Sequence, residues 1–259
     1  MNKHLKKLMA TGFASGAIAL GSMVLSSTSA LAFETAAKYA ILVDQQTGRV
    51  LLEKDADTAM APASMSKLMT VLMLFERLGD GSLSMDDTFP VSEKAWRMGG
   101  SKMFVGVNTR VPVKDLLRGI VVQSGNDACI VVAEGLASSE AAFADQMTAR
   151  GKEIGLENSI FANATGWPDP GQRMSTRDLA SVAKQLIEKF PQYYPIFAEK
   201  TFTYNGIRQG NRNPLLYRYD GADGLKTGHT EESGYGLVSS ATRKGRRLVL
   251  VVNGLTSVK

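Results

Sequence analysis

Cysteine and histidine are scarce in this 259-residue chain, which contains one cysteine and two histidines. The single cysteine, Cys129, rules out a disulfide framework within the chain, and no zinc site of cysteine and histidine ligands is expected. His4 lies in an N-terminal segment that is expected to be removed, so a Ser-His-Asp hydrolase would have to use His229 as its base. The shortage of histidine makes a lysine base attractive for serine chemistry, and neither a metal nor a cofactor is expected.

The first 32 residues differ in composition from the rest of the chain. Three lysines stand near the start, an apolar run rich in small residues follows, and the segment ends in Ala30-Leu31-Ala32. This order is typical of a secretory signal peptide and predicts an exported protein of the periplasm or cell envelope; the alternative is an uncleaved membrane anchor. Without the three lysines the net charge is 27 − 25 = +2, which does not indicate a nucleic-acid partner.

The stretch 64–78, SMSKLMTVLMLFERL, carries Met, Leu, Val or Phe on every side of a helix, which predicts a central buried helix. Ser64 and Lys67 are three residues apart and therefore project from one face within reach of each other. Burial disfavours an ammonium ion, so Lys67 would have a lowered pKa and could act as a neutral base beside the Ser64 hydroxyl. A second Ser-x-x-Lys match, at Ser181 and Lys184, lies in an amphipathic run where the lysine is expected to face water.

The order of the remaining elements predicts an α/β (α+β) fold. Alternating apolar residues predict one β-hairpin over 39–53 and a second over 235–253. Helices are expected over 113–123, 127–136, 139–156 and 175–190, and a short strand over 201–204. We therefore expect one domain over 33–259, in which strands from both chain ends form an antiparallel sheet covered by a helical subdomain of roughly 81–220.

Two further short motifs each occur once. Ser124-Gly125-Asn126 separates two predicted helices, where its hydroxyl and amide could face a cleft, or could simply cap the following helix. Lys226-Thr227-Gly228 precedes the second hairpin and supplies a cation, a hydroxyl and a position without a side chain. Such a strand edge could bind an anionic, extended peptide end, although a lone match could also be a turn.

In this order, SxxK, SxN and KTG are the signature set of penicillin-binding proteins and class A β-lactamases. Over residues 36–254 the chain resembles the low-molecular-mass penicillin-binding proteins that are D-Ala-D-Ala carboxypeptidases of the bacterial cell envelope. The segments PASMSKLMT, GSKMFVGVNTRVPVKDLLRGIVVQSGNDAC, FTYNGIRQGNRN and DGLKTGHTEESGYGLVSSAT carry this resemblance. It implies a β-lactamase/transpeptidase-like fold.

The resemblance also implies a substrate and a mechanism. The substrate would be a peptidoglycan stem peptide ending in D-Ala-D-Ala, β-lactam antibiotics would be covalent inhibitors, and the terminal D-Ala would be released through a serine acyl-enzyme. Ser64 would be the nucleophile and Lys67 its proton acceptor, although the base is disputed in the wider family. Ser124 would pass a proton to the leaving amine. The residues implied in substrate binding are Asn126, Lys226, Thr227, Gly228 and His229, the last through its main-chain N–H in an oxyanion hole shared with Ser64.

One departure from the family concerns the end of the chain. Family members normally continue with a final helix, a small β-rich domain and an amphipathic tail, whereas this sequence ends at Lys259. We therefore expect a domain truncated at its C-terminal end. Attachment to a membrane surface would be possible only through a part that is absent here.

Three alternative functions remain open. A class A β-lactamase would need a deacylating glutamate in a Glu-x-x-Leu-Asn segment, and 153–157 is one residue short of that pattern. A D,D-endopeptidase would share every catalytic residue. A non-catalytic peptidoglycan-binding protein would be expected to have lost the nucleophile or the lysine, and both are present.

Overall fold

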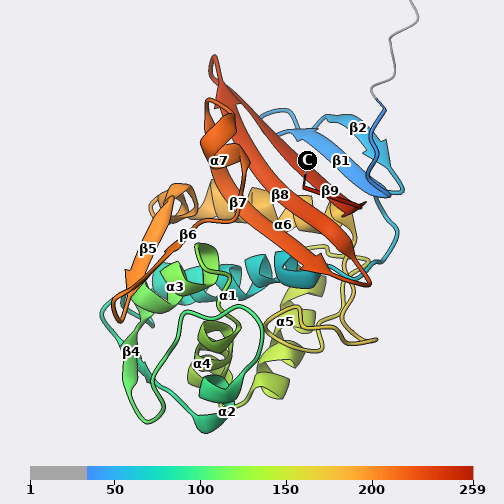
Figure 1. Cartoon of the computed structure of the whole chain (residues 1–259). Helices are drawn as coiled ribbons and strands as arrows, with labels where there is room; N and C mark the ends of the chain where they lie inside the picture. The colour runs from blue at the N-terminus through green and yellow to red at the C-terminus, as the bar shows by residue number, and fades with distance from the viewer. Residues whose placement is uncertain (1–33, 259) are drawn as a thin grey trace, which may run out of the picture. The chain divides into compact units, whose positions relative to one another are not determined.

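The computed structural model describes residues 34–258, so the predicted signal peptide lies outside the described residues. A five-stranded antiparallel sheet is built from both ends of this part of the chain, in the order β2-β1-β9-β8-β7 (Figure 1). The predicted fold class is therefore confirmed. The strands are β1 (Tyr39–Asp44), β2 (Val50–Lys54), β7 (Ala222–Thr230), β8 (Gly234–Arg243) and β9 (Arg246–Leu255).

The register of the sheet follows from its alternating pattern of side chains. Ile41 of β1 pairs with Val251 of β9, and both are fully buried. They face helix α6 (Thr176–Lys189), which packs against β1 and β9 and buries Leu179, Val182 and Leu186. Because side chains alternate between the two faces of a strand, this one-sided burial fixes the pairing.

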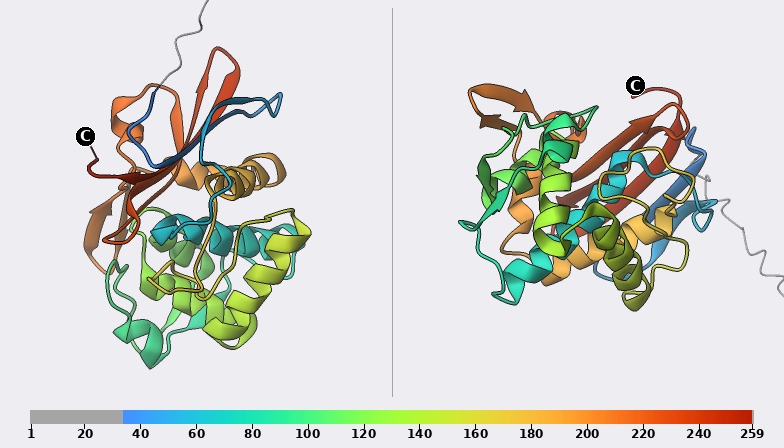
Figure 2. Two further views of the ribbon diagram at one scale, coloured as in Figure 1. Left: turned by 90° about the vertical axis from the view of Figure 1, so that its right-hand side faces the viewer. Right: turned by 90° about the horizontal axis from the view of Figure 1, so that it is seen from below.

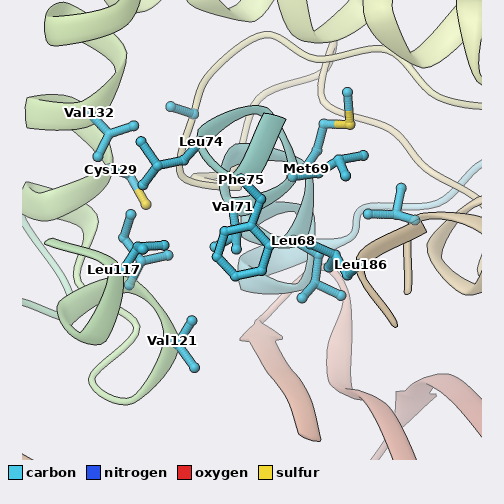
Figure 3. Close-up of a cluster of buried hydrophobic side chains, with 14 of the residues drawn as sticks. Leu68, Met69, Val71, Leu74, Phe75, Leu117, Val121, Cys129, Val132 and Leu186 are labelled. Atoms are coloured by element: carbon cyan, nitrogen blue, oxygen red, sulfur yellow. The ribbon is translucent and has the colours of Figure 1, made fainter. Parts of the chain in front are cut away.

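Helix α1 (Lys67–Gly79) is buried on all sides up to Phe75, as the sequence predicts, whereas Arg77 and Gly79 at its C-terminal end are exposed. The 3₁₀ turn η1 (Ala63–Ser66) precedes it, so the α-helix begins three residues later than expected. Figure 3 shows Phe75 of α1 among Leu186 of α6 and Leu117 and Val121 of α3 (Val113–Val121), with Cys129 of α4 (Asn126–Ala137) nearby. Burying side chains of this size contributes about 1.5–3 kcal/mol each, so α1 is held mainly by packing rather than by its caps.

The helical region that contains α1 lies against one face of the sheet (Figure 2). The predicted helices near 113–123 and 127–136 correspond to α3 and α4, and the one predicted over 139–156 ends earlier because Gly155 takes a positive φ of 81°. Among the described residues, no helix is long and apolar enough to cross a membrane. The remaining elements are β3 (Thr88–Pro90), α2 (Glu93–Arg97), β4 (Arg110–Pro112), α5 (Glu140–Glu153), η2 (Tyr194–Ala198), β5 (Thr201–Tyr204), β6 (Ile207–Gly210) and α7 (Leu215–Arg218).

Candidate active site

The first serine–lysine pair lies at the start of the central helix. Lys67 Nζ donates a hydrogen bond to Ser64 Oγ at 2.8 Å, and the lysine side chain is fully buried. Nζ also donates to Asn126 Oδ1 at 2.7 Å and to the main-chain carbonyl of Thr165. Burial is the main cause that lowers the pKa of Lys67 to about 8. Roughly a tenth of the amine is then neutral at pH 7, which is enough to supply a base beside the hydroxyl.

Tight backbone packing positions Ser64. The preceding residue, Ala63, has a positive φ of 48°, a conformation that costs a non-glycine residue about 1–2 kcal/mol. A Cβ atom on Gly166 would lie 1.9 Å from the Ala63 carbonyl oxygen, and a Cβ atom on Gly228 would lie 2.9 Å from that of Pro62. Only glycine allows both neighbouring segments to approach this closely. The turn before Ser64 is therefore held from two sides.

The second pair joins the other two motifs. Lys226 Nζ of β7 donates to Ser124 Oγ at 2.9 Å, and both side chains are buried. Burial is the main cause that lowers the pKa of Lys226 well below its usual value, and the positive charges of Lys67 and Arg212 add to the effect. Ser124 takes a positive φ of 59° in the turn between α3 and α4. Each serine hydroxyl therefore has a buried amine as its hydrogen-bond partner.

Ser124 and Asn126 do not cap the helix that follows them. Helix α4 begins at Asn126 with Gly125 as its N-cap, and no side chain bonds to that cap. The Asn126 amide oxygen instead accepts from Lys67, and its nitrogen donates to the Gly99 carbonyl at 2.9 Å. Asn126 thus connects Lys67 of α1 to the loop at the rim of the cleft.

Strand β7 forms the edge of the sheet and one wall of the site. Thr227, Gly228 and His229 line a cleft of about 530 Å³ together with Ser64 and Ser124. The exposed His229 ring stacks on Tyr235 of β8 at a centroid distance of 4.0 Å. The hydrogen-bond partner of the Ser64 hydroxyl is therefore Lys67, which supports a lysine rather than a histidine base.

Arg212 also lines the cleft, although no motif in the sequence marks it as a site residue. Its guanidinium donates to Ser101 Oγ at 2.6 Å, and partial burial lowers its pKa. The flanking asparagines are buried: Asn211 Nδ2 donates to the Glu199 carbonyl at 3.0 Å, and Asn213 Nδ2 to the Gly224 carbonyl at 2.7 Å. A polar GNRN segment was the only sequence signal, and it does not indicate which way the arginine points.

Asp127 was also missed, although it adjoins the second motif. Its buried carboxylate accepts main-chain hydrogen bonds from Met103 at 2.9 Å and from Phe104 at 2.8 Å. It thereby fixes the loop that carries Ser101. Its negative charge also raises the pKa of Lys67 and so opposes the larger, lowering effect of burial.

The other candidates lie outside this cleft. Glu153 is exposed and pairs with Arg150 at 2.7 Å, so it is not placed to activate a deacylating water. Lys184 of the second Ser-x-x-Lys match is about half exposed and lies 3.9 Å from Glu188. Among the described residues that line the cleft, none is Asp or Glu. No group of three His, Cys, Asp or Glu side chains that could hold a metal ion occurs within residues 34–258.

Comparisons with known proteins find relatives that match most of the chain. A family model described as D-alanyl-D-alanine carboxypeptidase, peptidase family S11, matches residues 25–257. The D-alanyl-D-alanine carboxypeptidase DacA of Escherichia coli K12 is 41% identical over 221 residues, which cover 83% of this chain and 55% of the relative. The chain thus spans about half the length of the curated relatives it matches.

Solved structures give the same match. The D-alanyl-D-alanine carboxypeptidase DacD of Francisella tularensis superimposes with a TM-score of 0.86 at 34% identity, covering 87% of this chain and 67% of that one. Penicillin-binding protein D2 of Listeria monocytogenes, solved in an ampicillin-bound form, has a TM-score of 0.76 at 29% identity. It covers 84% of this chain and 89% of its own.

Proposed function

Because the chain belongs to the D-alanyl-D-alanine carboxypeptidase family, we propose that it removes the terminal D-Ala from peptidoglycan stem peptides through an acyl-enzyme on Ser64. The resemblance found in the sequence is thereby confirmed at the level of the family. The observation that carries the proposal is the convergence of two serine–lysine pairs, at 2.8 Å and 2.9 Å, on one cleft.

Acylation begins with proton transfer from Ser64 to the neutral amine of Lys67. The Ser64 oxygen then bonds to the carbonyl carbon of the penultimate D-Ala, and the main-chain N–H groups of Ser64 and His229 stabilise the oxyanion. Removal of one such donor typically costs about 3 kcal/mol of transition-state stabilisation. The C–N bond breaks as Ser124 gives its proton to the leaving D-Ala nitrogen, and Lys226 is placed to replace that proton.

Cations recognise the terminal carboxylate of the substrate. Arg212 and Thr227 line the cleft, and Lys226 lies behind Ser124. In the free protein burial lowers the pKa of Lys226 most, and the positive charges of Lys67 and Arg212 lower it further. A carboxylate that enters this site would offset that repulsion between the cations. Asn126, held by Lys67 and Gly99, is placed to bind the amide carbonyl of the acyl part.

Before deacylation Lys67 must lose the proton that it took from Ser64, and that proton restores the one which Lys226 gave through Ser124. Water then attacks the ester, and a proton of that water reaches Ser64 through the neutral amine of Lys67. Lys67 is the base that the geometry offers, because no carboxylate lines the cleft among the described residues. In a β-lactam acyl-enzyme the expelled nitrogen stays attached to the acyl group, and no carboxylate among the described residues of the cleft is available to activate water. Such an adduct should therefore persist. This expectation disfavours a class A β-lactamase, and the ampicillin-bound form of the Listeria relative is consistent with it.

We place this activity outside the cytoplasm, in the periplasm or cell envelope. The relatives are bacterial D-alanyl-D-alanine carboxypeptidases, and the composition of residues 1–32 predicts export. A D,D-endopeptidase that acts on cross-links would use the same residues, so the carboxypeptidase assignment rests on the family.

The test is the intact mass of residues 33–259 after mixing with benzylpenicillin, followed over hours beside a Ser64→Ala variant. A long-lived adduct that is absent from the variant, together with release of D-Ala from a D-Ala-D-Ala peptide, is the expected result. Rapid loss of the adduct would indicate a β-lactamase, and failure of the folded protein to form any adduct would refute the serine mechanism.

A further inference from the structure

A cluster of polar side chains lies at the start of β7, three residues before Lys226. Its first member, Asp223, stands where the register of β7 with β8 shifts, between Ala222 and Gly224. An irregularity of this kind bends a strand and leaves the extra residue out of the ladder of main-chain hydrogen bonds. The position of this part of β7 therefore depends on the side-chain partners of Asp223.

Arg247 of β9 holds Asp223 from the far side of β8. The guanidinium makes a two-pronged contact, with Nη1 at 2.9 Å from Asp223 Oδ1 and Nη2 at 2.7 Å from Oδ2. Nη1 also donates to the hydroxyl of Ser240 on β8, the strand that lies between the other two. Because a two-pronged pair fixes direction as well as distance, the arginine ties three neighbouring strands together at one point.

Tyr194 of η2 completes the cluster. Its hydroxyl donates to Asp223 Oδ1 at 3.1 Å, and the guanidinium carbon of Arg247 lies 5.2 Å from the centroid of its ring. Tyr194 is buried, and burial raises the pKa of its phenol, so the hydroxyl keeps the proton that it donates. A Cβ atom on Gly224 would lie 2.9 Å from this hydroxyl oxygen, so only glycine lets η2 approach β7 this closely.

The link from this cluster to the active site is short. The Gly224 carbonyl accepts from Asn213 Nδ2 and from Ser239 Oγ, both at 2.7 Å, and both donors are buried. Lys226 lies two residues further along the strand, where its Nζ is 2.9 Å from Ser124 Oγ. Because a close-packed interior transmits displacements, a shift at the start of β7 carries the lysine with it.

We propose that Asp223, Arg247 and Tyr194, the β7 clamp, form a positioning unit for Lys226, an inference that rests on the proposed function. None of the three is among the described residues that line the cleft, so they act on the reaction only through the strand. They hold Lys226 Nζ where it can replace the proton that Ser124 gives to the leaving nitrogen. The clamp therefore serves the departure of the leaving group rather than the attack on the carbonyl.

Two substrates that differ only in the leaving group test this role. One is Nα,Nε-diacetyl-L-Lys-D-Ala-D-Ala, and the other has D-lactate in place of the terminal D-Ala, so both keep the same acyl part and the same terminal carboxylate. An amine leaves only after its nitrogen is protonated, whereas an alkoxide is a much better leaving group and needs that proton less. We expect Arg247→Met to lower kcat/KM about tenfold for the peptide and less than about threefold for the lactate ester.

Conservative variants separate positioning from a general loss of structure. Arg247→Lys keeps the charge without the two-pronged contact, so its effect on the peptide should lie between those of the wild type and Arg247→Met. Arg246→Met is the matched control, because Arg246 is the neighbouring residue of β9 and pairs with Asp44 of β1 at 2.5 Å, away from β7. It should leave the ratio of the two kcat/KM values unchanged.

Each rate is divided by the concentration of sites that benzylpenicillin titrates, so unfolded protein is not counted. Equal losses on the two substrates in Arg247→Met, or no loss on the peptide, would overturn the positioning role. If Arg247→Met does not fold, Tyr194→Phe decides the question, because it removes a single hydroxyl. That variant should lose about threefold on the peptide and nothing on the ester, and equal rates would refute the clamp. Failure of the proposed function would show separately, as absence of Ser64-dependent hydrolysis of both substrates by the wild type.

Discussion

The pH dependence of acylation follows from the burial of Lys67. With a pKa of about 8, the neutral fraction of the amine rises from roughly a tenth at pH 7 to roughly nine tenths at pH 9. The rate constant for acylation of Ser64 should therefore rise about tenfold over this interval and reach a plateau above it. An unshifted lysine, with a pKa of 10.5, would instead give a rise of about 100-fold and no plateau below pH 10.

The assay is the second-order rate constant for labelling by a fluorescent penicillin, measured from pH 6 to 10 at constant ionic strength. Circular dichroism at each pH shows whether the protein stays folded. A profile that is flat from pH 6.5 to 9, or one that is still rising tenfold per pH unit at pH 9.5, would refute the assignment of Lys67 as a neutral base.

Asp127→Asn identifies which lysine the profile reports. The Asp127 carboxylate opposes the lowering of the Lys67 pKa, and it is not among the groups that shift Lys226. Asparagine keeps an oxygen that can accept from the main-chain N–H of Met103 but removes the charge. The midpoint should move to lower pH in this variant, and an unmoved midpoint would assign the titration to another group.

Three further outcomes are expected. Gly166→Ala should lower the free energy of unfolding by about 3 kcal/mol or more in thermal unfolding, because the new Cβ would collide with backbone atoms. Gly155 has a similar positive φ but open space around it, so Gly155→Ala should cost only about 1 kcal/mol. Equal losses in the two variants would contradict the packing argument. Arg212→Ala should raise KM about tenfold or more for a D-Ala-D-Ala peptide with a free C-terminal carboxylate, and should leave the rate of hydrolysis of the corresponding C-terminal amide nearly unchanged. Equal effects on the two peptides would show that the arginine does not recognise the carboxylate. His229→Gln should lower the rate of penicillin acylation less than tenfold while Ser64→Ala abolishes it, and comparable losses would point back to a histidine base.

Local pattern was enough to predict the elements that carry the chemistry. The apolar run 64–78 predicted a buried helix, and three-residue spacing brought Ser64 and Lys67 together because that spacing returns to the same helix face. The two hairpins were likewise visible, since alternation of side chains is a property of neighbouring residues. The roles of the second and third motifs came from resemblance and not from spacing.

Tertiary structure alone decided which motifs come into contact and how far the pKa values of their lysines are lowered. Asn126 reaches Lys67 across 59 positions of sequence, and Lys226 reaches Ser124 across 102, distances over which helical and strand periodicity carry no information. The lowered pKa values of both lysines depend on complete desolvation, which only the packed domain provides. The position of Arg212 could not be foreseen either: in the sequence it is an ordinary charged residue in a loop, and only long-range contacts, such as its hydrogen bond to Ser101, place it at the cleft.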